Sequence, residues 1–178
     1  MSKELVFKLV VSESGKESYS ANLSYEIVSS IVSDFPDNES SNDFFRLAAQ
    51  HAASVVRENV AYKDHLDSDV LEILSKDSSI SVLRNLVRSQ AFRENVKQEE
   101  LLALIKLDTE VAQTIANNVD SYEQVDVNEL ASLLSKHEDP SVVYSLAQNW
   151  GTPKKILKTL LTHPDPYVSN EAKTRLED

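Results

Sequence analysis

The N-terminal part of the chain alternates apolar and polar residues. Apolar residues occupy every odd position from Leu5 to Val11, and a second alternation runs from Tyr19 to Leu23. The turn-forming sequence Ser14-Gly15-Lys16 lies between them. A period of two residues on both sides of a glycine turn predicts a β-hairpin. Because an isolated hairpin is only marginally stable in water, we expect it to dock on the rest of the fold.

From Leu23 onward the apolar residues adopt the spacing of a helix. Six apolar residues between Leu23 and Phe35 fall on one helical face, and Pro36 ends the pattern. Residues 37–42 are all polar and predict a loop. The alanine-rich segment after it predicts one long helix, from Phe44 to about Ala61.

The remainder of the chain contains an internal repeat. Residues 134–142 and 160–168 share the pattern Leu-x-x-His-x-Asp-Pro-x-Val at an offset of 26 residues, and residues 74–82 share part of it. The closing valine starts a second pattern, in which apolar residues follow four and five positions later. It recurs at intervals of 26, 29, 31 and 26 residues, at Val56, Val82, Val111, Val142 and, in part, Val168. This period is typical of one helix–turn–helix repeat of a solenoid.

Each repeat predicts a first helix that begins at the valine and a second helix that carries a leucine stripe. Asp-Pro at residues 139–140 and 165–166 suits the cap and first turn of the next helix. One repeat cannot bury its apolar residues alone, but stacked repeats can. We therefore predict an all-α fold, a short right-handed α-solenoid (an α-α superhelix) over residues 41–178. Residues 1–40, the hairpin and one helix, are predicted to cap it.

The C-terminal repeats resemble a known bacterial helical repeat. Residues 134–172 contain, in order, aspartate-proline, valine, alanine-x-asparagine, threonine-proline and spaced leucines. These are Asp139-Pro140, Val142, Ala147-x-Asn149, Thr152-Pro153, Ile156-Leu157 and Leu160. The order is similar to that of the leucine-rich repeat variant, while the longer upstream repeats are also similar to HEAT repeats. The resemblance implies a solenoid that interacts with macromolecules. The iron–sulfur cluster associated with the best-known member of that family is not implied, because this chain lacks cysteine.

Composition excludes several classes of site. The 178 residues include no cysteine and only two glycines, Gly15 and Gly151. Thiolate metal sites and disulfides are excluded by the first fact, and glycine-rich phosphate loops by the second. We expect no cofactor and no bound metal. The N-terminal apolar run is too short and too interrupted for a signal peptide or a membrane span, so we expect a cytoplasmic protein.

The polar residues that recur in the repeat allow two interpretations. His137 and His163 would lie one repeat apart on the same edge, as would Asp139 and Asp165. A metal-binding or proton-sensing histidine pair is the first interpretation. The second is that each histidine ends a helix, where its positive charge is favourable, and that each aspartate caps the next helix. We favour the second interpretation because the repeat itself accounts for the spacing.

Two exposed aromatic residues and two basic rows are not explained by the repeat, and they are our candidates for partner binding. Tyrosine and tryptophan are enriched in binding hot spots, although a tryptophan in this turn could instead cover the end of the core. The first two basic residues are four positions apart and would share a helix face. The candidates are Tyr144, Trp150, Arg84, Arg88, Lys154, Lys155 and Lys158.

Charge narrows the choice of function. The formal net charge is −11, which repels nucleic-acid backbones and anionic membranes. The sequence contains no motif of a catalytic site, so we hypothesise a non-catalytic protein–protein interaction module. One alternative is a nucleic-acid-binding, HEAT-like protein similar to DNA glycosylases, which would require the basic rows to meet in one groove. Another is an acidic inhibitor or immunity-type protein whose charge attracts a basic active site.

Overall fold

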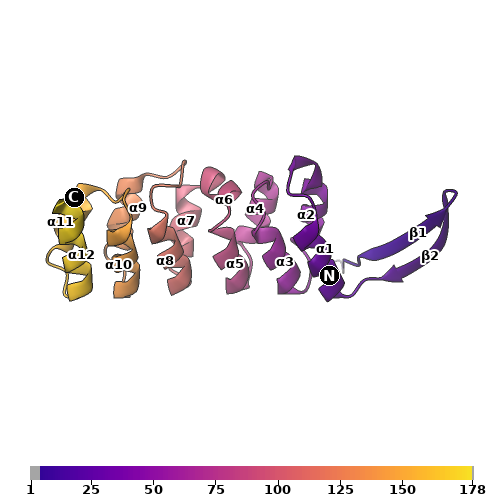
Figure 1. Ribbon diagram of the computed structural model, residues 1–178, viewed down its shortest axis with the longest axis horizontal. Helices are drawn as coiled ribbons and strands as arrows, with labels where there is room; N and C mark the ends of the chain where they lie inside the picture. The colour runs from indigo at the N-terminus through magenta and orange to yellow at the C-terminus, as the bar shows by residue number, and fades with distance from the viewer. Residues whose placement is uncertain (1–4, 178) are drawn as a thin grey trace. The chain divides into compact units, whose positions relative to one another are not determined.

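The computed structural model describes residues 5–177, which form a two-stranded hairpin followed by many short helices (Figure 1). The mostly helical fold and the N-terminal hairpin predicted from the sequence are confirmed. The chain divides into two compact units, Met1–Ala91 and Phe92–Asp178, and the division falls within α6 (Gln90–Asn95). Residues 1–40 belong to the first unit, and their role as a cap stays a prediction.

The hairpin pairs β1 (Lys8–Glu13) with β2 (Lys16–Asn22) in antiparallel register. Ser14 and Gly15 form the turn with φ angles of 53° and 78°. Positive φ at both central residues matches the twist that a tight hairpin needs. The register shifts between Val11 and Ser12, so that β2 carries one more residue than β1 at this point.

The residue before β1 contacts the helices. The Phe7 ring lies edge-on to Phe44, with centroids 6.1 Å apart. Every residue of β1 is exposed, and so is nearly all of β2. The expectation that the strands dock is therefore wrong for the strands themselves.

The helices of the first unit pack in two rows. In the first row α1 packs against α3 and α3 against α5, while α2 and α4 pack beside them. The elements are α1 (Tyr25–Asp34), the 3₁₀ helix η1 (Glu39–Ser41), α2 (Asn42–Ala48), α3 (Ser54–Ala61), α4 (Ser68–Ser75) and α5 (Ile80–Leu86).

The long helix predicted from Phe44 to Ala61 is wrong, because α2 and α3 are separate helices. Residues 49–53 form the turn between them. His51 Nδ1 accepts a hydrogen bond from the backbone N–H of Ala53 at 3.0 Å and closes this turn. The high alanine content of this segment therefore gave no indication of the turn between the two helices. We call such a turn between helices of the repeat a corner.

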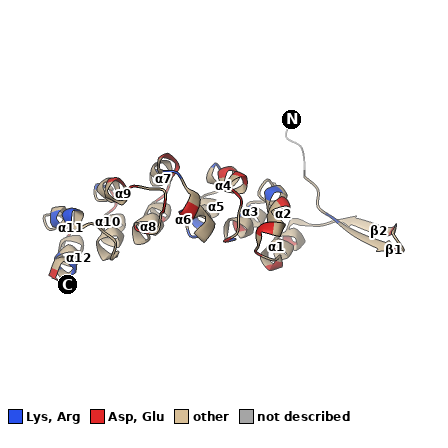
Figure 2. Ribbon diagram, turned by 90° about the horizontal axis from the view of Figure 1, so that it is seen from above, with Lys and Arg blue, Asp and Glu red and all other residues tan. Residues whose placement is uncertain are grey.

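The second unit repeats the arrangement of two rows. Helices α8, α10 and α12 pack side by side in one row, and α9 and α11 lie in the other (Figure 2). The elements are α7 (Gln98–Leu104), α8 (Thr109–Asn117), α9 (Val127–Leu134), α10 (Pro140–Gln148), α11 (Lys154–Leu160) and α12 (Pro166–Glu177).

The repeat valine is the third residue of its helix in α3, α5, α8, α10 and α12. Each of these helices begins two residues earlier than predicted, and each repeat valine is fully buried. Burying one such side chain stabilises the fold by about 1.5–3 kcal/mol. In α8 the preceding Asp108 accepts from the backbone N–H groups of Glu110 and Val111, which fixes the start of the helix before the valine.

No helix among residues 5–177 has the length and apolar content required to cross a membrane.

Candidate functional site

The repeat histidines are hydrogen-bond acceptors at the corners between helices. His137 Nδ1 accepts from the backbone N–H of Asp139 at 3.0 Å, and His163 Nδ1 accepts from that of Asp165 at 3.1 Å. An imidazole nitrogen that accepts a hydrogen bond carries no proton. Each histidine thus lies at the end of a helix, as the favoured interpretation has it. The physical reason is a hydrogen bond that the histidine accepts, and a positive charge is not required.

The repeat aspartates cap the helices that follow these corners. Asp139 Oδ1 accepts from the N–H of Ser141 at 2.9 Å, and Asp165 Oδ1 from that of Tyr167 at 2.8 Å. Hydrogen bonds from the Ser141 hydroxyl and N–H hold the pKa of the Asp139 carboxyl below its ordinary value. Within residues 5–177 no three His, Asp or Glu side chains are grouped as a metal ion would need.

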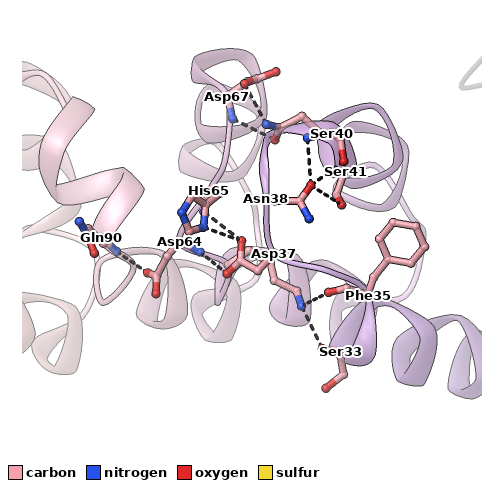
Figure 3. Close-up of polar contacts among 12 residues, drawn as sticks. Ser33, Phe35, Asp37, Asn38, Ser40, Ser41, Asp64, His65, Asp67 and Gln90 are labelled. Carbon is pink, nitrogen blue, oxygen red and sulfur yellow. Dashed lines mark hydrogen bonds and ion pairs between the residues drawn. The ribbon is translucent and has the colours of Figure 1, made fainter.

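Aspartates also join neighbouring repeats of the first unit. The Asp37 carboxylate accepts from the backbone N–H groups of Asp64 and His65 at 2.9 and 3.0 Å (Figure 3). One repeat later, Asp64 Oδ1 accepts from the N–H of Gln90 at 2.7 Å. These carboxylates hold the loops of neighbouring repeats together.

The side chain seven residues after the repeat valine donates hydrogen bonds to the end of the helix that carries the preceding position in the same row. This contact joins neighbouring helices within each unit. Lys63 Nζ donates to the carbonyls of Ser33 and Phe35, at the end of α1, at 2.9 and 3.0 Å (Figure 3). Asn149 Nδ2 donates to the carbonyl of Asn117, the last residue of α8, at 2.6 Å. The last carbonyls of a helix have no partner within it, so these side chains satisfy groups that would otherwise be unpaired.

Trp150 lies in the turn between α10 and α11, and hydrogen bonds and close packing hold the residues around it in place. Asn149 Oδ1 accepts from the N–H of Gly151 at 2.7 Å, and the buried Thr152 hydroxyl donates to Leu146 O at 2.5 Å. A Cβ on Gly151 would lie 2.2 Å from Cβ of Asp120, so this glycine is needed for close packing. Trp150 lies between these fixed residues.

Trp150 is held in place although it is exposed. Its side chain is 75% exposed, and the guanidinium carbon of Arg175 lies 3.6 Å from the centroid of its ring. Arg175, at the seventh position after Val168, is only 8% exposed and donates to Asn149 O at 3.4 Å. A guanidinium over an indole face is a favourable cation–π contact. Trp150 therefore does not cover the core, and its ring is ordered by a buried cation.

The helix after this turn carries only positive charges. Lys154, Lys155 and Lys158 are exposed on α11, and α11 contains no acidic residue. Figure 2 shows blue, the colour of lysine and arginine, on this helix. A groove of about 550 Å³ lies between α9 and α11. Its charged side chains are Lys136 and Lys155, and no carboxylate lines it. We call Trp150 with Lys154, Lys155 and Lys158 the Trp150 surface.

The remaining candidates lie elsewhere. Tyr144, on α10, is half-buried, so the prediction that it is exposed is wrong, and its hydroxyl accepts from Gln148 Nε2 at 3.1 Å. Arg84 lies on α5, but Arg88 follows the end of that helix, so the predicted shared helix face is wrong. Both arginines belong to the first unit and the lysines to the second, so neither unit contains both basic rows.

Comparison with protein-family models, with curated proteins and with solved structures finds no match to the chain. The structure itself shows a mostly helical protein of many short packed helices with a small N-terminal hairpin.

Proposed function

We propose that this protein is a non-catalytic protein-binding module and that the Trp150 surface receives an acidic segment of another protein. The observation that carries the proposal is the ordered, exposed indole of Trp150 beside a helix with only basic charges. Tryptophan is among the residues most enriched in binding hot spots.

The charge of the surface decides the chemistry of the partner. The chain as a whole is acidic, with a net charge of −11, and therefore repels acidic proteins in general. Local rows such as Lys154, Lys155 and Lys158 attract only a segment whose carboxylates can reach them, and such pairing confers specificity. The resemblance of residues 134–172 to the leucine-rich repeat variant agrees with a role in macromolecular interaction, as an analogy of fold.

Site-specific photo-crosslinking tests the proposal. A benzophenone amino acid replaces Trp150 in cells that naturally make the protein, and the control places it at Tyr62, which is 64% exposed in the first unit. We expect a discrete crosslinked protein from position 150 and none from position 62. Charge reversal, K154E with K155E and K158E, should abolish the product because it repels the acidic segment.

Three outcomes would count against the proposal. They are the same product from both positions, a product insensitive to the charge reversal, and no product at position 150. A product that nuclease removes would favour the nucleic-acid alternative.

A further inference from the structure

Exposed apolar side chains concentrate at the N-terminal end of the first unit. Among residues 5–177, 15 large apolar side chains are exposed, and eight of them lie between Val6 and Ile31. Four belong to the hairpin strands: Leu9, Val10, Val11 and Tyr19 are each about half exposed. A concentration of this kind marks an interaction surface, whereas scattered apolar residues do not.

The hairpin needs a further strand. It is a two-stranded sheet, and no other strand among the described residues pairs with either outer edge. Two strands alone are marginal in water, whereas three or more with an apolar face are stable. An unprotected edge strand is a template for pairing with another chain.

The β1 edge is the better template of the two. β2 carries the extra residue, Ser18, at the register shift, and a bulge of this kind disrupts the edge on which it lies. β1 is regular, and Leu9 to Ser12 contain neither a charge nor a proline that would block pairing.

The backbone of β1 has the correct phase for pairing about Val10. The carbonyl of Phe7 accepts from the N–H of Leu23 on the β2 side, at 2.9 Å. Because hydrogen-bonding direction alternates along an antiparallel strand, the N–H and C=O of Val10 point away from β2. Two Val10 residues could thus exchange both hydrogen bonds across a two-fold axis.

This register is self-complementary in side chains and charge. With Val10 on the axis, Leu9 lies opposite Val11 of the second copy and Lys8 opposite Ser12, so no like charges meet. The strands carry Lys8 and Lys16 against Glu13 and Glu17 and are neutral together. Two chains of net charge −11 repel one another over most of their surface, which leaves the neutral hairpin as a favourable place for self-contact.

We propose that the protein forms a two-fold dimer in which β1 pairs antiparallel with β1 of a second copy about Val10. The resulting four-stranded sheet places Leu9, Val11 and Tyr19 of both copies on one face. The contact is isologous and closed, so it stops at two copies. The dimer is independent of the Trp150 surface, which lies in the other unit.

Sedimentation equilibrium of the full-length chain tests the dimer. We expect wild type to have twice the mass of one chain, and Val10→Lys to raise the dimer dissociation constant at least about tenfold, because two lysines then meet at the axis. Tyr62→Lys changes another exposed residue, at a helix end of the same unit, and should leave the dimer intact. Far-UV circular dichroism verifies that both variants are folded.

Cysteine crosslinking gives a second readout that does not depend on a disruptive change. The chain has no cysteine, so a single introduced thiol reports only its own position. Oxidation with copper phenanthroline should join Val10→Cys into a covalent dimer far faster than Tyr62→Cys. A monomeric wild type, a dimer that survives Val10→Lys, or equal crosslinking at both positions would each overturn the proposal.

Discussion

At the scale of single residues, the repeat histidines act through an unprotonated nitrogen. The same position in an earlier repeat is Asp77, whose Oδ1 accepts from the backbone N–H of Ser79 at 2.8 Å. Histidine and aspartate are alike there only in offering an acceptor to the N–H two residues later. The feature that these corners have in common is therefore the hydrogen bond and not the imidazole.

His163 provides a direct test of this role. We expect His163→Ala to lower the free energy of unfolding by about 1 kcal/mol, because the N–H of Asp165 loses its acceptor. His163→Asn should retain most of the stability, since its Oδ1 can occupy the place of Nδ1. Urea unfolding followed by far-UV circular dichroism measures both. Equal losses for alanine and asparagine would show that packing of the imidazole, rather than the acceptor, is what stabilises the corner.

At the scale of helices, a mostly buried ion pair joins α3 to the corner after α4. Arg57 Nε and Nη2 donate to the two Asp77 oxygens at 2.5 and 2.9 Å, and the side chains are 14% and 5% exposed. Burial alone would raise the pKa of the Asp77 carboxyl. The hydrogen bonds from Arg57 and from the N–H of Ser79 more than offset it and hold that pKa below its ordinary value.

The depressed pKa predicts how stability depends on pH. The Arg57–Asp77 contact contributes its full share of the free energy of unfolding above the pKa of an unfolded aspartate. That contribution is lost as the pH falls through the lower pKa of Asp77 in the folded state. Asp77→Asn should cost about 2–3 kcal/mol at neutral pH, and the gap from wild type should narrow below about pH 4.

Urea unfolding at a series of pH values measures that gap. The matched control is Glu72→Gln, which alters an exposed pair with Lys76 and should change stability by less than about 0.5 kcal/mol. A gap between wild type and Asp77→Asn that is constant across the acidic range would contradict the assignment.

The helical elements could be predicted from the sequence where apolar spacing and corner residues agree. The L-x-x-H-x-D-P-x-V frame located α10 and α12 to within two residues, because leucine, valine and the Asp-Pro cap all act locally. The break between α2 and α3 was missed, since His51 is followed by alanines instead of Asp-Pro. The corner hydrogen bond survives there without its usual sequence.

The donors between repeats could not be predicted in this way. Lys63, Asn149 and Arg175 all stand seven residues after a repeat valine, yet they share no residue type. What they share is that each donates a hydrogen bond to a backbone carbonyl about 26 to 32 residues earlier in the chain. Only folding brings such a carbonyl close to the donor. The contact at the candidate site could not be predicted for the same reason. The sequence indicated that Trp150 is exposed, but the Arg175 guanidinium that lies on its ring comes from the next repeat.

At the scale of the whole molecule, acidic charge is distributed evenly. The first unit contains nine basic and 14 acidic residues, and the second contains nine and 15. Neither unit neutralises its own charge. The ion pairs at exposed sites, such as Arg46 with Asp43, Asp67 and Asp69, are worth little individually.

Self-repulsion should therefore govern the response to salt. Raising NaCl from about 10 mM to about 150 mM shortens the screening length from about 30 Å to about 8 Å. Repulsion among carboxylates spread over the surface then weakens more than short-range pairs do, so we expect the thermal unfolding midpoint to rise by a few degrees, about 2–4 °C. Scanning calorimetry at one fixed protein concentration measures it.

A charge variant shows whether repulsion is the cause. Lys158 is exposed on α11, so Lys158→Glu changes the net charge from −11 to −13 at little structural cost. Its midpoint should be lower than wild type at low salt and should approach wild type as salt is added. If the wild-type midpoint instead falls with salt, local ion pairs such as Arg57–Asp77 outweigh the net charge, and the acidic surface cannot be the reason that self-contact is confined to the neutral hairpin.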